Sequence, residues 1–169
     1  MTSSQFILRE YTQADHEHTF RWLQQIELRR YLGTRSAPTE ASHVDWFARM
    51  RSRTDVRLFA VDFKTIHVGN LYLVDVDTGD SRAEVQLFIG EAKLRGQGIG
   101  TCTLRLIQEE AFKKMNLHRL YAYVFDFNHR ALKCFLESGF VREGFLRDHR
   151  HTENGFVGVH ILGRLRHDG

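Results

Sequence analysis

Proline is almost absent from this chain, in which Pro38 is the only one among 169 residues. Low-complexity tracts and internal repeats are also missing, so no segment is typical of an interdomain linker or a repeat protein. With 42% hydrophobic and 12% aromatic residues, the chain can bury one sizeable core and is too short to suggest two. We therefore expect a single globular domain over residues 1–169.

The two cysteines, Cys102 and Cys134, lack the paired spacings of a disulfide framework or a zinc site. No stretch approaches the roughly 18 apolar residues that span a bilayer, and no basic cluster precedes an apolar run near the first residue. These absences favour a cytoplasmic protein with free thiols and no membrane contact. The net charge is +3, which slightly favours an anionic ligand. The basic residues are dispersed along the chain, so they do not indicate nucleic acid binding.

Hydrophobic spacing predicts one strand, then helices, then mostly strands with helices inserted. The predicted strands cover residues 6–11, 56–63, 67–77, 82–90 and 118–127, followed by a closing hairpin of 140–149 with 155–165. A short helix over 129–138 is expected before that hairpin. The apolar faces predicted for the other helices are Ala14, Phe20, Trp22 and Leu23, then Val44, Phe47, Ala48 and Met50, then Leu104, Ile107, Ala111 and Met115.

Three glycines, Gly96, Gly98 and Gly100, lie within five residues between a predicted strand and a predicted helix. A turn of this kind leaves N–H groups unpaired at the positive end of the helix dipole. Because glycine has no side chain, a phosphate can approach these amides closely, and Arg95 adds a positive charge. The alternative is a surface turn that only caps the helix. The combination of strand, arginine, glycines and helix favours an anion site.

The glycine loop does not match the common nucleotide-binding patterns. Thr101 and Cys102 follow Gly100 where a nucleoside-triphosphate loop has Lys and Ser or Thr. A dinucleotide fingerprint fits only in part, because Thr101 also occupies the place of its third glycine. The pattern that fits is R-x-x-G-x-G, at Arg95, Gly98 and Gly100, which resembles the coenzyme A pyrophosphate loop of the GNAT superfamily of acyl-CoA N-acyltransferases.

A second segment supports this resemblance. Asn128, Ala131, Gly139 and Phe140 match the superfamily's strand, N-x-x-A helix and terminal Gly-Phe. The resemblance covers Phe6 to about Leu165 and is nearest to the bacterial branch containing ribosomal-protein N-terminal, spermidine and amino-sugar-nucleotide acetyltransferases. It implies an α/β (α+β) fold whose mixed, mostly antiparallel central sheet has splayed fourth and fifth strands and is flanked by helices.

The resemblance also implies acetyl-CoA as cosubstrate, with no metal. The pantetheine arm would lie along the edge of the strand at residues 87–89, and the N–H of Phe88 or Ile89 would stabilise negative charge on the thioester oxygen. Asn128 has a helix N-cap as a compatible alternative role, and Arg130 a solvated surface charge. The expected cosubstrate contacts are Leu87, Phe88, Ile89, Arg95, Gly96, Gln97, Gly98, Ile99, Gly100, Thr101, Asn128, Arg130 and Phe135.

An amine must be neutral to attack a thioester, so the reaction needs a general base. Glu84 is the predicted base, and its alternative role is a salt bridge with Arg82 or Arg95. Phe135 departs from the superfamily, because many relatives have a tyrosine there that protonates the departing thiolate. Either water or another hydroxyl, such as that of Tyr72 or Tyr123, protonates the thiolate, or the thiolate leaves unassisted, which its modest basicity permits. A covalent intermediate on Cys134 is disfavoured, because no His/Asp arrangement surrounds it.

The acceptor amine is predicted from the side chains of the N-terminal helices and the hairpin. The segment with Arg29, Arg30 and Arg35 is basic, which suits an anionic acceptor, whereas polyamines call for an acidic groove. Trp22, like Trp46, also fits helical core spacing, and the histidines at 149 and 151 indicate substrate contact more than a metal. The expected acceptor contacts are Trp22, Arg30, Tyr72 and His149.

The sequence therefore predicts an acetyl-CoA-dependent N-acetyltransferase. Its acceptor is expected to be a small amino sugar or a nucleotide-linked amino sugar, acetylated by direct transfer. The alternatives are a protein N-terminal acetyltransferase of the ribosomal-protein type or a polyamine acetyltransferase, and, in a different class, a non-catalytic coenzyme A-binding module. A homodimer is compatible with the sequence.

Overall fold

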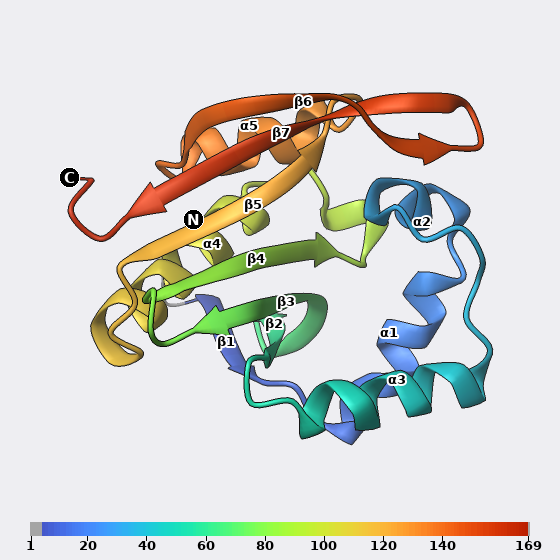
Figure 1. Ribbon diagram of the computed structural model, residues 1–169. Coiled ribbons are helices and arrows are strands. Elements are labelled where there is room, and N and C mark those ends of the chain that lie inside the picture. The colour runs from blue at the N-terminus through green and yellow to red at the C-terminus, as the bar shows by residue number, and fades with distance from the viewer. Residues whose placement is uncertain (1–4, 169) are drawn as a thin grey trace.

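The computed structural model describes residues 5–168, which form a seven-stranded sheet with helices on both faces (Figure 1). The strand order is β1-β2-β3-β4-β5-β7-β6. Neighbouring strands are antiparallel except β4 and β5, which are parallel. The strands are β1 (Phe6–Glu10), β2 (Arg57–Phe63), β3 (Ile66–Asp77), β4 (Arg82–Ile89), β5 (Arg119–Phe125), β6 (Val141–Thr152) and β7 (Gly155–Leu165).

The helices lie in three of the connections between strands. The chain from β1 to β2 forms the 3₁₀ turn η2 (Gln13–Asp15) and the helices α1 (His16–Leu23), α2 (Ile26–Leu32) and α3 (Glu40–Ser52). The chain from β4 to β5 forms the 3₁₀ turn η3 (Ala92–Leu94), α4 (Ile99–Glu109) and the π-helical turn η4 (Glu110–Lys114). Helix α5 (His129–Glu137) connects β5 to the β6–β7 hairpin.

Each face of the sheet has its own core. Helices α4 and α5 cover one face, where Leu104, Ile107 and Phe135 are buried with Val85 of β4. Helices α1 to α3 lie toward the other face, where Phe88 of β4 is buried in a cluster with Trp22, Leu28 and Tyr72. The alternation of side chains along β4 thus supplies both cores from one strand.

The helical faces predicted for the N-terminal region are partly wrong. In α3 the buried residues are His43 and Phe47, while Val44 is 47% exposed. Before α1, Ala14 is exposed. The sequence also did not separate α2 from α1, although Gly33, in the left-handed conformation (φ 69°), ends α2 as a typical C-terminal glycine.

Buried polar residues explain why apolar spacing was misleading in this region. Thr19 of α1 and Asn70 of β3 are fully buried, and the Asn70 amide donates to the Thr19 hydroxyl (2.8 Å) and the Tyr72 hydroxyl (3.1 Å). The Asn70 carbonyl oxygen lies 2.8 Å from His67 Nε2. Since buried polar groups need partners, this network helps to fix α1 on the sheet.

The parallel pair of β4 and β5 is short. The strands pair only from Arg82↔Arg119 to Glu84↔Tyr121, after which they separate (Figure 1). On its other side, β4 stays paired with β3 as far as Gly69↔Ile89. Residues 85–89 therefore have a free edge toward β5. This geometry confirms the splayed fourth and fifth strands, and with them the predicted fold class.

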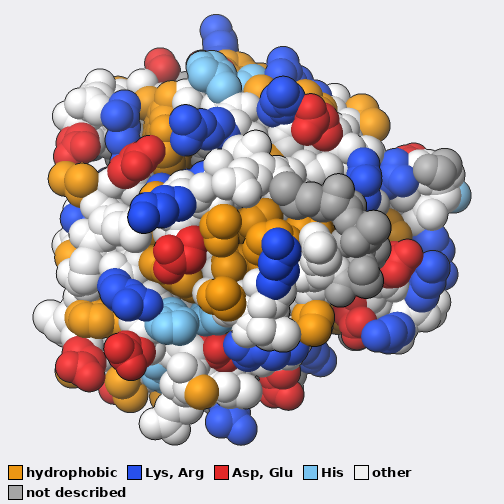
Figure 2. All heavy atoms as spheres, turned by 180° about the vertical axis from the view of Figure 1, so that it is seen from behind, with side chains coloured by type: hydrophobic (Ala, Val, Ile, Leu, Met, Phe, Trp, Pro, Cys, Tyr) orange, Lys and Arg blue, Asp and Glu red, His pale blue; other side chains and the backbone are white. Residues whose placement is uncertain are grey.

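The surface supports the expected dispersal of charge. On the face seen in Figure 2, acidic and basic side chains are interspersed around a central group of hydrophobic side chains. None of the helices formed by residues 5–168 combines the length and the apolar character that a bilayer crossing requires.

Candidate active site

A cleft opens where β4 and β5 separate, and we call it the β4–α5 cleft. It has a volume of about 390 Å³ and is lined by residues from the end of β4, the glycine loop, α5 and α2. All residues predicted to contact the cosubstrate line it except Gln97 and Ile99. The Ile99 side chain is buried in the core, and the Gln97 side chain donates to the Lys93 carbonyl (2.8 Å). The structure brings the predicted set together, while the binding roles remain predictions.

The glycine loop offers open backbone at the start of α4. Gly96 and Gly98 both have φ of 79°, and a Cβ built on either would meet no atom within 4 Å. The N–H of Cys102 donates to the Gly98 carbonyl (3.0 Å). The N–H groups of residues 98–101 therefore come before this hydrogen bond in the chain and have no acceptor within the helix. They lie at the positive end of the helix dipole. This arrangement suits a phosphate group.

Helices α4 and α5 approach closely beside this loop. A Cβ on Gly100 would lie 2.8 Å from Cys134 Sγ, so the absence of a side chain permits the contact. The Thr101 hydroxyl lies 3.6 Å from the same sulfur, and burial raises the pKa of the Cys134 thiol. A protonated thiol is a poor nucleophile, which agrees with direct transfer rather than an intermediate on Cys134.

Arg95 is tied to the protein around the loop. Its Nε donates to the Ile89 carbonyl (2.8 Å), and a terminal nitrogen donates to the Gly90 carbonyl (2.9 Å) and to Gln25 Oε1 (2.8 Å). These bonds join the end of β4 to the start of α2. Arg95 thus shapes the cleft with most of its donors already engaged, whereas Arg130 is exposed on the lining and forms no ion pair within residues 5–168.

Helix α5 forms another wall of the cleft. Asn128 is its N-cap, because the Asn128 side chain accepts a hydrogen bond from the Ala131 N–H (3.2 Å). This confirms the capping role, and Asn128 also lines the cleft. Phe135 packs edge-on against Phe140, with ring centroids 5.0 Å apart. Phe135 lies in the lining, at the position where the sequence resemblance leads us to expect a tyrosine.

A second cleft, the Glu84 cleft, adjoins the first and has a volume of about 460 Å³. Its lining includes Glu84 and Gln86 from β4, Tyr123 from β5, and His149 and Arg150 from β6. The two clefts are continuous, because one set of residues lines both. The shared residues are Tyr31, Leu32, Leu87, Asn128, Ala131 and Phe135.

Glu84 stands at the last paired position of β4, where the strands part. Burial raises the pKa of its carboxyl group, the hydrogen bond from Gln86 Nε2 (2.9 Å) opposes this shift, and the charge of Asp75 adds to it. No salt bridge joins Glu84 to either predicted arginine among the described residues, and Arg82 instead pairs with Asp77 and Asp80. A cleft carboxylate with a raised pKa is a stronger base than an ordinary glutamate, which suits it to accept a proton from the amine.

A third cavity, the arginine pocket, has a volume of about 380 Å³ and is lined by residues of α2 and of the tip of the β6–β7 hairpin. These two elements lie on the same side of the molecule (Figure 1). Phe125 and Arg150 line both this pocket and the Glu84 cleft, so the two join. Arg30 stacks over the Phe127 ring at 5.3 Å. The charged residues and histidine of the pocket are Arg29, Arg30, Arg35, Arg150, His151 and Glu153.

The charge of this pocket is mainly positive. Arg30, Arg35 and Arg150 form no ion pair with any acidic residue in the described part of the chain. Arg29 donates to the carbonyls of Leu23 (2.9 Å) and Gln24 (2.7 Å). Several unneutralised guanidinium groups beside aromatic rings form a suitable environment for a phosphate attached to a planar ring.

The predicted acceptor contacts divide into two groups. Arg30 lines the arginine pocket and His149 the Glu84 cleft. Trp22 is only 1% exposed, with Nε1 donating to Glu91 (2.9 Å), so it cannot form a wall for an acceptor. Tyr72 is also buried, and burial raises its pKa well above the ordinary value. Both predictions are corrected, and core packing is the role of these two side chains.

Sequence reasoning missed Tyr31, which lines the β4–α5 cleft and the Glu84 cleft. Its position depends on α2, which was not recognised as a separate helix. The available signal was Gly33, because a glycine after "IELRRYL" marks the end of a short helix that would present Tyr31 near its last turn.

A model of the acetyltransferase (GNAT) domain family matches residues 5–141. Spermidine N(1)-acetyltransferase of Escherichia coli (strain K12) is 31% identical over 99 residues, which are 59% of this chain and 52% of that protein. The enzyme of the same name from E. coli O157:H7 gives the same values. The chain thus spans about half the length of the curated relatives it matches.

Solved structures show the same fold. Spermidine N-acetyltransferase from Vibrio cholerae in complex with CoA and spermine aligns with a TM-score of 0.90 at 21% identity, over 96% of each chain. The dodecameric structure of spermidine N-acetyltransferase from that organism aligns with a TM-score of 0.81 at 20% identity, over 96% of this chain and 95% of the other.

The open glycine loop gives a test of the expected coenzyme A site. We expect Gly98→Val to abolish measurable acetyl-CoA binding, because the new side chain would occupy the space in front of the amides and strain a backbone with positive φ. Isothermal titration calorimetry with acetyl-CoA measures the effect.

Gly155→Val is the matched control, since Gly155 also has positive φ (100°) with no atom within 4 Å of a built Cβ. Gly155 is the first residue of β7, next to the hairpin turn. This variant should lose about as much free energy of unfolding as Gly98→Val and keep the wild-type affinity for acetyl-CoA. Unchanged affinity in folded Gly98→Val protein would remove the phosphate-loop assignment.

Proposed function

The chain belongs to the GNAT acetyltransferase domain family, and on this basis we propose that it transfers an acetyl group from acetyl-CoA directly to a primary amine. The observation that carries the proposal is the position of Glu84. This carboxylate lies where β4 and β5 part, in a cleft continuous with the one that contains the glycine loop. A base beside a thioester channel is what amine acylation requires.

The proposed reaction uses the two clefts together. Acetyl-CoA lies in the β4–α5 cleft with its phosphates at the glycine loop, and the amine enters through the Glu84 cleft. Glu84, directly or through water, removes a proton from the amine as nitrogen attacks the thioester carbon. The N–H of Phe88 or Ile89 stabilises the charge that develops on the carbonyl oxygen. The carbon–sulfur bond then breaks and releases coenzyme A.

A non-catalytic coenzyme A-binding module is the rival from a different class, suggested by Phe135. Such a module needs the β4–α5 cleft alone. The adjoining cleft, with a carboxylate whose pKa burial raises, favours an enzyme. Release of coenzyme A in the presence of amines distinguishes the two. The expected homodimer and cytoplasmic location remain predictions.

For the acceptor we propose an amine that carries anionic groups, such as a nucleotide-linked amino sugar. The arginine pocket supports this choice, because Arg30, Arg35 and Arg150 present positive charge next to the Glu84 cleft. Phosphates would lie among these arginines, a base would stack near Phe125 and Phe127, and the sugar amine would reach Glu84. A polycation in the same pocket would be repelled.

A polyamine is the second candidate, and the comparisons favour it. The curated relatives and the aligned solved structures are spermidine acetyltransferases, and none acts on a nucleotide sugar by its name. In the Glu84 cleft and the arginine pocket, the carboxylates available to a polyamine are Glu84 and Glu153. The charge of the arginine pocket therefore favours the sugar nucleotide, and similarity to known enzymes favours the polyamine. Measuring the reaction rates with both acceptors distinguishes the two candidates.

The raised pKa of Glu84 leads to a prediction for pH dependence. A general base must be deprotonated to act, so activity should fall as the pH drops through the pKa of Glu84. An ordinary glutamate has a pKa near about 4.3. Because the pKa of Glu84 is raised, this acidic limb of the pH–rate profile should lie at higher pH. Glu84→Gln should lower kcat about 100-fold and remove this limb. Steady-state rates across the pH range provide the measurement.

Glu109→Gln is the control, because Glu109 is an exposed helical glutamate whose contact is Lys113 at 3.5 Å. It should leave kcat and the pH profile unchanged. Wild-type turnover in Glu84→Gln protein would contradict the assignment of the base, and a parallel loss of acetyl-CoA affinity would indicate a structural role.

The acceptor is tested by comparing kcat/KM for a nucleotide-linked 4-amino-4,6-dideoxy sugar, spermidine and a peptide with a free α-amine. We expect the sugar nucleotide to react fastest and its advantage to shrink at moderate ionic strength, since salt screens the arginines. Removing two charges with Arg30→Gln and Arg35→Gln should cost the sugar nucleotide about tenfold, which corresponds to roughly 1.4 kcal/mol.

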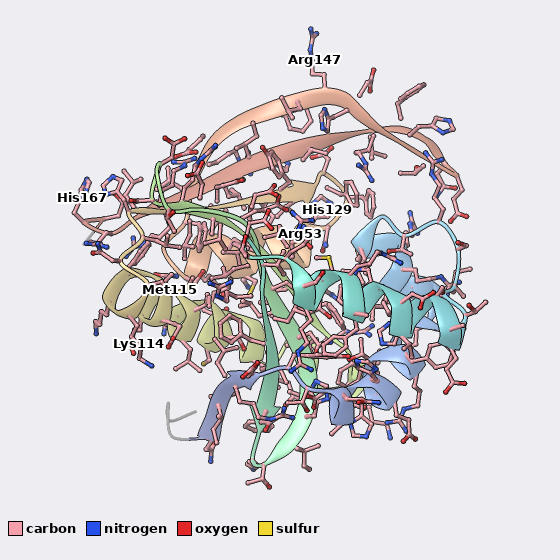
Figure 3. The ribbon with its side chains drawn as sticks, turned by 60° about the horizontal axis from the view of Figure 1, so that its bottom comes forward. Arg53, Lys114, Met115, His129, Arg147 and His167 are labelled. Carbon is pink, nitrogen blue, oxygen red and sulfur yellow. The ribbon has the colours of Figure 1, made fainter. Side chains whose placement is uncertain are left out.

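Arg147→Gln provides the charge-matched control, since Arg147 extends outward from the hairpin, away from the rest of the protein (Figure 3). It should leave all three acceptors unaffected. Faster reaction with spermidine would establish the polyamine candidate, and faster reaction with the peptide would indicate a protein N-terminal acetyltransferase.

A further inference from the structure

The reaction proposed above needs a proton for the departing thiolate, and Phe135 cannot donate one. We propose that Tyr31 is the general acid that protonates the sulfur of coenzyme A. This inference rests on the proposed acetyl transfer and adds a catalytic residue that the sequence did not predict.

The geometry of the two clefts restricts where the acid must lie. The thioester carbon belongs to a molecule in the β4–α5 cleft and is attacked from the Glu84 cleft, so the sulfur is released at their junction. Only residues that line both clefts border that junction, namely Tyr31, Leu32, Leu87, Asn128, Ala131 and Phe135. Tyr31 has the one hydroxyl in this set, and the Asn128 amide is not an acid at accessible pH.

The other hydroxyl and thiol groups line at most one of the two clefts. Tyr123 lines the Glu84 cleft and is 50% exposed, so water surrounds much of it. Thr101 and Cys134 line only the β4–α5 cleft, where they contact each other. Tyr72 lines neither, and its hydroxyl accepts a hydrogen bond from Asn70 inside the core.

Local structure holds Tyr31 at this place. Helix α2 ends one turn after Arg29, because the Thr34 N–H donates to the Arg29 carbonyl (3.0 Å) and Gly33 adopts the left-handed conformation. The Tyr31 ring packs on Phe127, with centroids 6.1 Å apart and planes tilted by 33°. Phe127 directly precedes the N-cap of α5. The ring is therefore braced between two elements that border the junction.

The proton transfer balances without another reactant. As the tetrahedral intermediate collapses, the carbon–sulfur bond breaks and its electron pair passes to sulfur. The Tyr31 O–H bond breaks, its proton forms the S–H bond of free coenzyme A, and the tyrosinate recovers a proton from water. The ordinary pKa values are near about 8.5 for a thiol and about 10 for a phenol, so this proton transfer is slightly unfavourable in water, and we place its effect at the lower end of general acid catalysis.

Tyr31→Phe tests this role, assayed with acetyl-CoA and the fastest of the three acceptors compared above. We expect kcat to fall about 100-fold, near the lower end of general acid effects. The dissociation constant of acetyl-CoA, measured by calorimetry, should change less than about twofold, because a hydroxyl that acts during bond cleavage contributes little to ground-state binding.

Rescue distinguishes an acid from a merely structural ring. Phe135 lines the same junction, so Phe135→Tyr in the Tyr31→Phe background returns a hydroxyl from α5. The double variant should recover at least about tenfold in kcat. A structural defect at Tyr31 would not respond to a hydroxyl on another helix.

Three outcomes would overturn the inference. These are wild-type kcat in folded Tyr31→Phe protein, a loss that the second substitution fails to restore, or a larger loss of kcat in Tyr123→Phe than in Tyr31→Phe. Failure of the proposed function has a different signature, because then the unmodified protein would release no coenzyme A with any of the three acceptors.

Discussion

The site depends on the early end of hydrogen bonding between β4 and β5. The strands pair only as far as Glu84 and Tyr121, and each unpaired residue beyond that point leaves backbone groups that need partners. A ligand can form hydrogen bonds with these backbone groups. The fold stays stable without them, because β4 remains hydrogen-bonded to β3 along its other edge. The same separation places Glu84 at the point where the two clefts meet.

Packing on both faces keeps the strands apart. Helices α4 and α5 approach through Gly100 and Cys134 on one face, while α1 is fixed by the hydrogen bonds of Asn70 on the other. Arg95 joins the end of β4 to α2 through its bonds to Ile89 and Gln25. The cleft walls are therefore parts of the core, which lets them hold reacting groups with little movement.

The parts predictable from sequence are those determined by local pattern. The alternation along β4, the glycine loop and the Asn128 cap depend on neighbouring residues, and all were recognised. Thr19 and His43 were missed on their helices because tertiary hydrogen bonding and ring packing bury them. Tyr31 and the arginine pocket were inaccessible for another reason, since they depend on how α2 meets the hairpin and α5, a relation between segments more than 90 residues apart.

If the separation of β4 and β5 creates one channel for acyl transfer, coenzyme A must lie along the free edge of β4. A crystal structure of the protein with coenzyme A tests it most directly. We expect the pyrophosphate on the amides of residues 97–101, the pantetheine along residues 87–89, and the sulfur within about 3.5 Å of the Tyr31 hydroxyl. A coenzyme A molecule bound elsewhere, or one whose sulfur points away from the junction of the clefts, would contradict it.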